Sequence, residues 1–175
     1  LGGGSGVGSY FLSEPTWPAK YNDQPLMADW GRNAIYLHRI APDGPTFTQK
    51  VEEFAKISQV TDLDVDPSGQ MFISAWDGAG FKGNPGKGYV ARLTPQGWTH
   101  RAFPDLASSK LAALTELLTS PSATTRFYAQ QEILARPSEA AAAKPALTAL
   151  IRRTALPLAA RVAALFTLAQ LESDP

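Results

Sequence analysis

Residues 1–103 contain short runs in which apolar and polar positions alternate, separated by turn residues. The clearest run spans residues 61–76, where Leu63 and Val65 alternate with aspartates and the turn Pro67-Ser68-Gly69 leads into a second apolar run. Alternation with a period of two, interrupted by Pro and Gly, is typical of two paired β-strands. We therefore expect a β-hairpin across this segment.

A similar pattern occurs earlier in the chain. Trp30 aligns with Trp76, and Arg39-Ile40-x-Pro42-x-Gly44 aligns with Arg92-Leu93-x-Pro95-x-Gly97. The extra residues of the second copy fall in a glycine-rich loop at 77–88. Repeats of about 50 residues with Pro and Gly turns are typical of propeller blades. The pattern predicts a partial β-propeller with about two four-stranded blades.

Two blades are too few for a closed ring, because a propeller needs at least about four. An unclosed pair would leave sheet edges open and one inner face exposed. We therefore expect the remaining blades to come from a longer polypeptide or from other copies of this chain.

The second half, residues 104–175, has no Gly or Trp and is rich in Ala and Leu. Apolar residues recur there at steps of three and four, which predicts helices. The predicted helices are Leu106–Thr119, Ala123–Ala135, Glu139–Arg153 and Leu158–Leu171, with Pro145 as an alternative start of the third. Residues 114–118 match 147–151, and 126–134 match 161–169. This region is therefore expected to form HEAT-like helical repeats, and 1–103 the blades.

Charge and cysteine content exclude several classes of function. Sixteen basic and sixteen acidic residues cancel, so generic binding to nucleic acid is not expected. The absence of cysteine excludes disulfides, thiolate metal sites and covalent haem at a C-x-x-C-H motif in these residues. No apolar run is long enough for a transmembrane helix, and residues 1–8 lack the features of a signal peptide.

Several short motifs stand in a distinctive order. They are Asp29-Trp30-Gly31, Ile35-Tyr36, Pro42-Asp43-Gly44, Thr61-Asp62-Leu63-Asp64-Val65-Asp66 and Gly88-Tyr89-Val90-x-Arg92-Leu93, followed directly by the helical repeats. This order resembles a family of large bacterial secreted proteins. In that family, a propeller similar to sorbosone and soluble glucose dehydrogenases precedes HEAT repeats and a C-terminal c-type cytochrome. The resemblance covers the last propeller blades and the first HEAT repeats.

The resemblance implies a fragment of a periplasmic or secreted dehydrogenase of the pyrroloquinoline-quinone (PQQ) type. Such a protein would oxidise a sugar or alcohol, use PQQ with Ca²⁺, and pass electrons to a cytochrome module. Related pockets are assembled from many blades, so this chain alone is not expected to be active, and whether it belongs to an enzyme stays open. The alternative is a non-catalytic propeller and HEAT scaffold that binds proteins or glycans.

Three aspartates on one predicted strand and turn, Asp62, Asp64 and Asp66, are candidate ligands for Ca²⁺, which prefers oxygen ligands. The EF-hand pattern is not met, because Ile73 stands where a glutamate is required. In the alternative interpretation, Asp66 starts the turn and the other two are solvated or cap backbone amides.

The remaining candidates for ligand binding are Asp62, Asp29, Trp30, Trp76 and His38. Asp62 begins the predicted innermost strand, where propellers bind ligands around the central channel. The two tryptophans occupy equivalent positions, which also suits a packing role between blades. His38 can act as a base, although a lone histidine on a strand is more often solvated or hydrogen-bonded.

Overall fold

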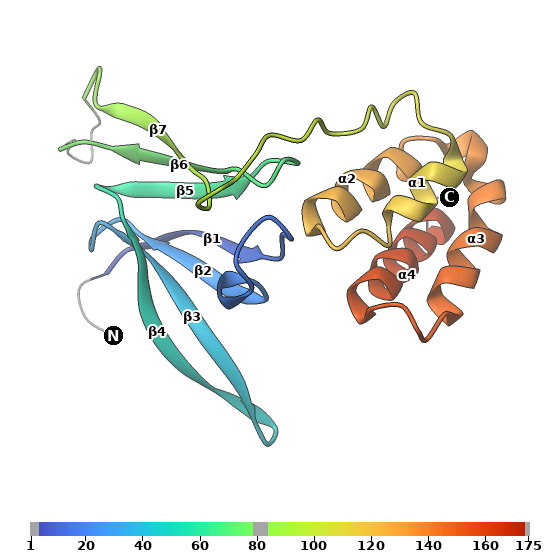
Figure 1. Cartoon of the computed structure of the whole chain (residues 1–175), viewed down its shortest axis with the longest axis horizontal. Helices are drawn as coiled ribbons and strands as arrows, with labels where there is room; N and C mark the ends of the chain where they lie inside the picture. The colour runs from blue at the N-terminus through green and yellow to red at the C-terminus, as the bar shows by residue number, and fades with distance from the viewer. Residues whose placement is uncertain (1–3, 79–83, 174–175) are drawn as a thin grey trace. The chain divides into compact units, whose positions relative to one another are not determined.

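The computed structural model describes residues 4–78 and 84–173 of the chain (Figure 1). It divides into two compact units between Arg101 and Ala102, close to the boundary expected after residue 103. The first, the β unit, is built of strands, and the second, the helical unit, of helices. The predicted separation of β and α regions is confirmed. Part of the glycine-rich loop, 79–83, lies outside the described residues.

The β unit contains two antiparallel sheets whose strands follow the order of the chain. The first sheet comprises β1 (Gly6–Leu12), β2 (Gln24–Asp29), β3 (Ala34–Asp43) and β4 (Thr46–Lys56). The second comprises β5 (Val60–Val65), β6 (Met71–Trp76) and β7 (Gly88–Leu93). Because successive side chains of a strand point to opposite faces, the alternating apolar residues give each sheet one apolar face toward the other.

The core of the β unit lies between these two inner faces. It contains Leu12, Trp17, Leu26, Ala28, Ile35 and Leu37 from the first sheet and its loops, and Val60, Leu63, Val65, Met71 and Ile73 from the second. β1 and β5 lie beside each other, so the first strands of the two sheets meet. Removing so many apolar side chains from water is the main force that holds the sheets together.

In the part of the chain that the structure describes, the second sheet has three strands instead of the predicted four. Within the described residues, β7 pairs with β6 alone. The indole Nε1 of Trp98 donates a hydrogen bond of 3.0 Å to the carbonyl of Ser68, which ties the segment after β7 to the turn between β5 and β6. Residues 98–103 also lack the alternation that would favour a fourth strand.

The tight turn between β5 and β6 is held by its own side chains and by a distant tryptophan. Gly69 has a φ of +85°, which favours glycine. The Asp66 carboxylate accepts hydrogen bonds from the backbone N–H groups of Ser68 (2.8 Å) and Gln70 (2.9 Å). Trp17 Nε1 donates to the carbonyl of Gly69 at 2.8 Å. The loop between β1 and β2 is thereby fastened to this turn.

Gly8 lies where β1 approaches β5. A Cβ added at Gly8 would lie 2.7 Å from the Cα of Asp62, whereas one added at Gly6 would meet nothing within 4 Å. Gly8→Ala is therefore expected to lower the free energy of unfolding by about 1–3 kcal/mol, because the strands must move apart. Gly6→Ala is the matched control, with little expected change. Urea unfolding followed by tryptophan emission checks this; equal effects of the two variants would contradict it.

The helical unit contains four helices, α1 (Leu111–Leu117), α2 (Ala123–Leu134), α3 (Ala140–Arg152) and α4 (Leu158–Ser173). α1 packs on α2 and α3 on α4, and further contacts join α1 to α3 and α2 to α4. The two helix pairs therefore pack against each other. Their common core includes Leu114, Leu118, Ala129, Ile133, Ala143, Leu147 and Ala164. No helix in the described part of the chain has the length and apolar character needed to cross a membrane.

Two expected helix starts are wrong. The first helix begins at Leu111 instead of Leu106, because the carbonyl of Asp105 accepts hydrogen bonds from the Ser109 (2.7 Å) and Ser108 (3.3 Å) hydroxyls, which compete with helical bonding. The Ser108 side chain also lowers the pKa of Asp105. The alternative start at Pro145 is wrong because α3 already begins at Ala140. A run of alanines before Pro145 favours the helix strongly.

Candidate functional site

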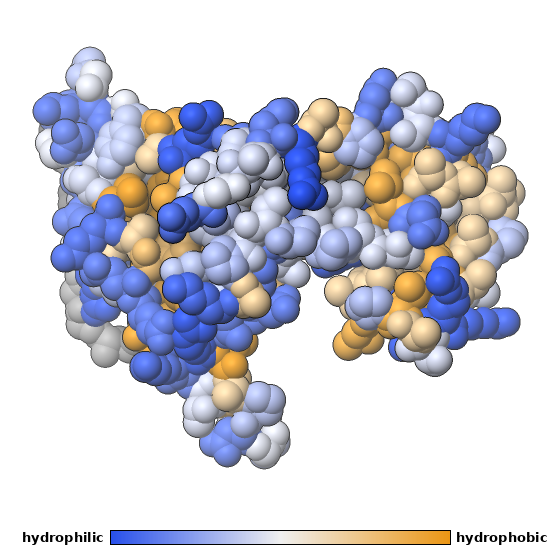
Figure 2. Space-filling model, viewed as in Figure 1, coloured by the Kyte–Doolittle hydropathy of each residue, from blue (hydrophilic) through white to orange (hydrophobic). Residues whose placement is uncertain are grey.

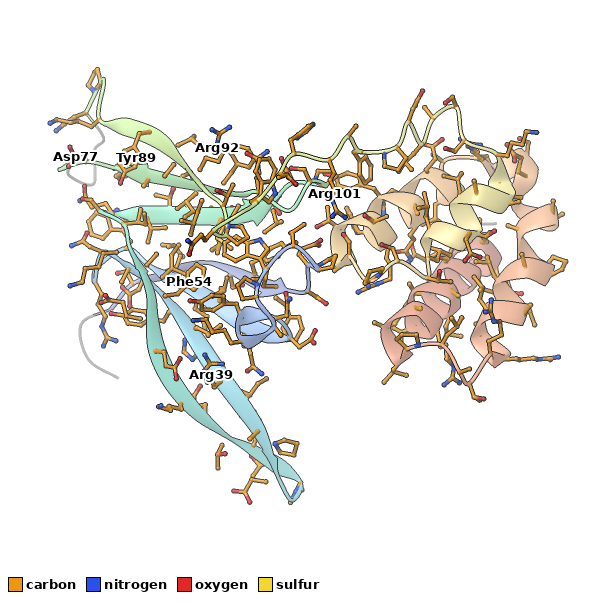
Figure 3. The ribbon with its side chains drawn as sticks, viewed as in Figure 1. Arg39, Phe54, Asp77, Tyr89, Arg92 and Arg101 are labelled. Carbon is orange, nitrogen blue, oxygen red and sulfur yellow. The ribbon has the colours of Figure 1, made fainter. Side chains whose placement is uncertain are left out.

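The candidate site is the outer face of the second sheet, which points away from the first. It is formed by Asp62 and Asp64 on β5, Phe72 and Ser74 on β6, and Val90 and Arg92 on β7. The ladders place Asp62, Ser74 and Val90 in one row and Asp64, Phe72 and Arg92 in the next. A hollow of about 240 Å³ on this face is lined by Asp62, Leu63, Asp64, Phe72, Ser74 and Val90. Figure 3 labels Arg92 on β7.

Two large apolar side chains of this face are open to solvent. Val90 is 69% exposed and Phe72 is 38% exposed. An antiparallel sheet with one face in water normally places polar residues on that face. This face is therefore mixed, with Phe72 and Val90 exposed among four polar or charged side chains.

The two sheets share a backbone hydrogen bond at the same place, as repeats do. The N–H of Trp30 donates to the carbonyl of Ser5 (2.8 Å), just before β1, and the N–H of Trp76 donates to that of Gln59 (3.1 Å), just before β5. Trp30 and Trp76 thus hold equivalent places, as the sequence alignment predicted. Their rings touch edge to face, with centroids 6.4 Å apart. The arrangement favours packing over ligand stacking.

If Trp30 and Trp76 are taken as equivalent positions, the strand pairing shows which other residues of the two sheets are equivalent. Ala28 lies opposite Ile35 in the first sheet, as Ser74 lies opposite Val90 in the second. Ala28 and Ile35 are fully covered by the second sheet. The sequence alignment placed Arg39 opposite Arg92, and this is wrong by two residues. In the strand pairing, the residue of the first sheet that is equivalent to Arg92 is Leu37. The shift was not visible in the sequence, because the loop at 77–88 is longer than its counterpart in the first copy.

The outer face of the first sheet also exposes apolar side chains among polar ones. It carries Ser9, Phe11, Pro25, Met27, Tyr36, His38 and Val51, of which Phe11, Met27 and Val51 are large, apolar and exposed. Met27 is three residues before Trp30, as Ile73 is before Trp76. Ile73 is fully buried between the sheets. This face is therefore the equivalent of the inner face of the second sheet.

The three aspartates proposed for Ca²⁺ are separated. Asp62 and Asp64 lie on the outer face and accept hydrogen bonds from the next backbone N–H, at 2.9 and 2.7 Å. Asp66 caps the turn, as the alternative interpretation had it. Within the described ranges, no three His, Asp or Glu side chains gather around a point that could hold a metal ion.

The other predicted ligand residues, Asp29 and His38, lie on strands of the first sheet. The Asp29 carboxylate accepts hydrogen bonds from the N–H groups of Ser5 (2.8 Å) and Arg32 (3.0 Å) and so shapes the end of β2. His38 lies on the outer face of the first sheet, with Nδ1 3.1 Å from Gln49 Oε1. Asp62 and His38 therefore belong to different surfaces.

Sequence reasoning missed an aromatic group beside the core. Trp17 packs edge to face on Tyr21 (6.4 Å between centroids), and both contact Phe54 (6.0 and 5.3 Å), which Figure 3 labels. A hollow of about 340 Å³ lies here, lined by Trp17, Pro18, Lys20, Tyr21, Phe54, Leu93, Thr94, Pro95 and Gln96. The spacing of these residues in sequence carries no signal that would bring them together.

A small ion-pair network lies on β3 and β4. Arg39 Nε is 2.9 Å from Glu52, and Lys50 Nζ is 3.3 Å from it. The hydrogen bond from Arg39 lowers the pKa of Glu52 below its usual value. Glu52 therefore favours the folded state when ionised, and this contribution is lost as the pH falls through its lowered pKa. The group is solvent-exposed, so the effect on stability is small.

Comparisons of the chain with protein-family models, curated proteins and solved structures found no match.

Proposed function

We propose that this chain is a binding scaffold built from repeats. In this proposal the β unit is a pair of consecutive blades from a β-propeller, and the helical unit is a pair of HEAT-like repeats. One observation carries it: the exposed Val90 and the half-buried Ser74 of the second sheet occupy the places that Ala28 and Ile35 fill between the sheets. In a stack of repeats, each unit covers the next in this way.

The chain path supports the same interpretation. Each sheet is a simple up-and-down meander, and the last strand of the first sheet leads directly into β5, which lies beside β1. Radially repeated sheets with this connection are typical of propellers. Both outer faces expose large apolar residues, among them Met27 and Val90, which supports contact with a further sheet.

The helical unit supports a scaffold through its exposed apolar surface. α4 leaves one apolar stripe open, formed by Leu158, Val162, Leu165 and Phe166, and Figure 2 shows apolar side chains at the surface of this unit. These residues recur at steps of three and four and so share one side of the helix. In helical repeat arrays such a side packs on a further repeat or on a partner.

The dehydrogenase activity that the motif resemblance implies is a narrower proposal, supported by the order of those motifs alone. It is tested by dye reduction with PQQ and Ca²⁺ in the complete gene product. The scaffold is the better-supported function, because the equivalence of the two sheets supports it, whereas the dehydrogenase rests on motif order alone.

A tandem variant tests the repeat architecture. A second copy of residues 6–59 is placed before Gly6 in the 175-residue chain. We expect the denaturant dependence of unfolding, followed by tryptophan emission, to become steeper, because the added sheet buries the outer face of the natural first sheet. The matched control carries Leu26→Lys and Leu37→Lys in the added copy only. An added segment that proteases digest like an unfolded chain, with an unchanged slope, would overturn the proposal.

A further inference from the structure

Two hollows of the β unit adjoin each other and differ in character. The larger, of about 340 Å³, lies beside the aromatic group of Trp17, and we call it the aromatic hollow. The smaller, of about 160 Å³, is the polar hollow, with walls that include Thr16, Gln96, Thr99 and Arg101. Gln96 lines both hollows, and Figure 3 labels Arg101. An apolar space next to a few polar groups is the usual form of a small-molecule site.

The aromatic hollow offers flat apolar walls. Tyr21 and Phe54 meet edge to face with their ring centroids 5.3 Å apart, and both side chains are half-buried. Trp17 is held in place by its hydrogen bond to the carbonyl of Gly69. The volume of this hollow lies within the range of pockets that hold small organic molecules. Its walls therefore suit a flat apolar group such as a benzene ring.

The charges around the hollows favour an anion. Lys20 lines the aromatic hollow and Arg101 the polar one, and the described residues that line them include no acid. Lys20 Nζ already lies over the ring of Tyr21, 4.7 Å from its centroid. In the described part of the chain, no acidic side chain lies within ion-pair distance of Arg101. An arginine can hold a carboxylate through two parallel N–H donors.

A buried polar atom at the wall of the polar hollow points to the same chemistry. Within the described residues, Thr16 Oγ1 makes no hydrogen bond although it is shielded from solvent. Buried hydroxyls are normally paired. A carboxylate in the polar hollow supplies the missing acceptor when the Thr16 hydroxyl rotates about the Cα–Cβ bond.

We infer that the two hollows together bind a small organic acid, with its flat apolar group in the aromatic hollow and its carboxylate at Arg101. Both hollows are lined by the loop between β1 and β2 and by the segment after β7. A bound acid therefore contacts both segments. This site goes beyond the proposed scaffold and does not depend on it, because its walls belong to a single β unit.

The test uses the 175-residue chain, labelled for heteronuclear NMR, with phenylacetate as the probe. The indole N–H groups of the four tryptophans serve as local reporters, because Trp17 and Trp98 line the hollows. We expect phenylacetate to shift the signals of Trp17 and Trp98 in a saturable way. Those of Trp30 and Trp76, which line neither hollow, should stay in place. Phenylacetamide, with the same ring but no charge, is expected to bind at least about tenfold more weakly.

Two matched variants locate the carboxylate. Arg101→Gln removes the cation of the polar hollow and is expected to weaken phenylacetate binding about tenfold while phenylacetamide binding stays the same. Lys20→Gln removes the cation of the aromatic hollow and is expected to keep the preference for the acid. Both side chains are exposed, so neither change should disturb the fold. Unchanged Trp30 and Trp76 signals in the free variants check this.

Three results would overturn the inference. The first is the absence of a saturable shift of the Trp17 and Trp98 signals at up to about 10 mM phenylacetate. The second is equal binding of phenylacetate and phenylacetamide, which would mean that no cation holds the carboxylate. The third is a loss of the preference for the acid in Lys20→Gln instead of Arg101→Gln, which would place the carboxylate in the aromatic hollow.

Discussion

Trp17→Ala is expected to lower the free energy of unfolding of the β unit by about 4 kcal/mol. Trp17 is only 6% exposed and belongs to the core between the two sheets. Its removal leaves a cavity beside Tyr21 and Phe54 and leaves the carbonyl of Gly69 without its buried hydrogen bond. The lost packing and the unpaired carbonyl both contribute to the cost.

Urea unfolding followed by tryptophan emission measures this effect. All four tryptophans precede residue 102, so the emission follows the β unit, and three emitters remain in the variant. Trp17→Phe keeps an aromatic ring but lacks the indole N–H, and we expect it to cost about 1–2 kcal/mol. A loss below about 1 kcal/mol for Trp17→Ala would mean that the loop is not fastened to the turn as described.

The strands of the β unit were predictable because their signal is local. In β5 and β6, alternating residues such as Leu63, Val65 and Ile73 carry the period of the pleat, and all three are buried. That the described part of the second sheet ends at β7 was not predictable from the sequence, because the segment after β7 is held by a hydrogen bond from Trp98 to Ser68, thirty positions apart in the chain. A side-chain contact over that separation leaves no periodic pattern.

The candidate site was predictable only in part, for a similar reason. The turn role of Asp66 and the packing role of the tryptophan pair follow from local motifs, and both were among the interpretations considered. The openness of Phe72 and Val90 could not be read from the sequence. Their alternation is the same whether a face is covered or open, and only the placement of the neighbouring sheet decides which it is.

Arg136 has the largest expected effect in the helical unit. Its guanidinium donates to the carbonyls of Ser109 (2.8 Å), Leu106 (2.9 Å) and Ala107 (3.0 Å), and to Glu132 Oε1 (2.7 Å). It is 17% exposed. The three carbonyls precede α1, and the planar fork of arginine can serve them at once. Arg136 therefore ties the segment before α1 to the end of α2.

Arg136→Ala is expected to lower the free energy of unfolding of the helical unit by about 3 kcal/mol, because several charge-assisted hydrogen bonds are lost and Leu106 is released from the core. Far-ultraviolet circular dichroism follows this unit in urea. Arg136→Lys should lose most of the same stability, since an ammonium cannot reproduce the fork. Arg152→Ala removes an exposed arginine at the end of α3 and should change stability by less than about 0.5 kcal/mol. Equal effects of Arg136→Ala and Arg152→Ala would contradict the assigned role, because charge alone would then explain both.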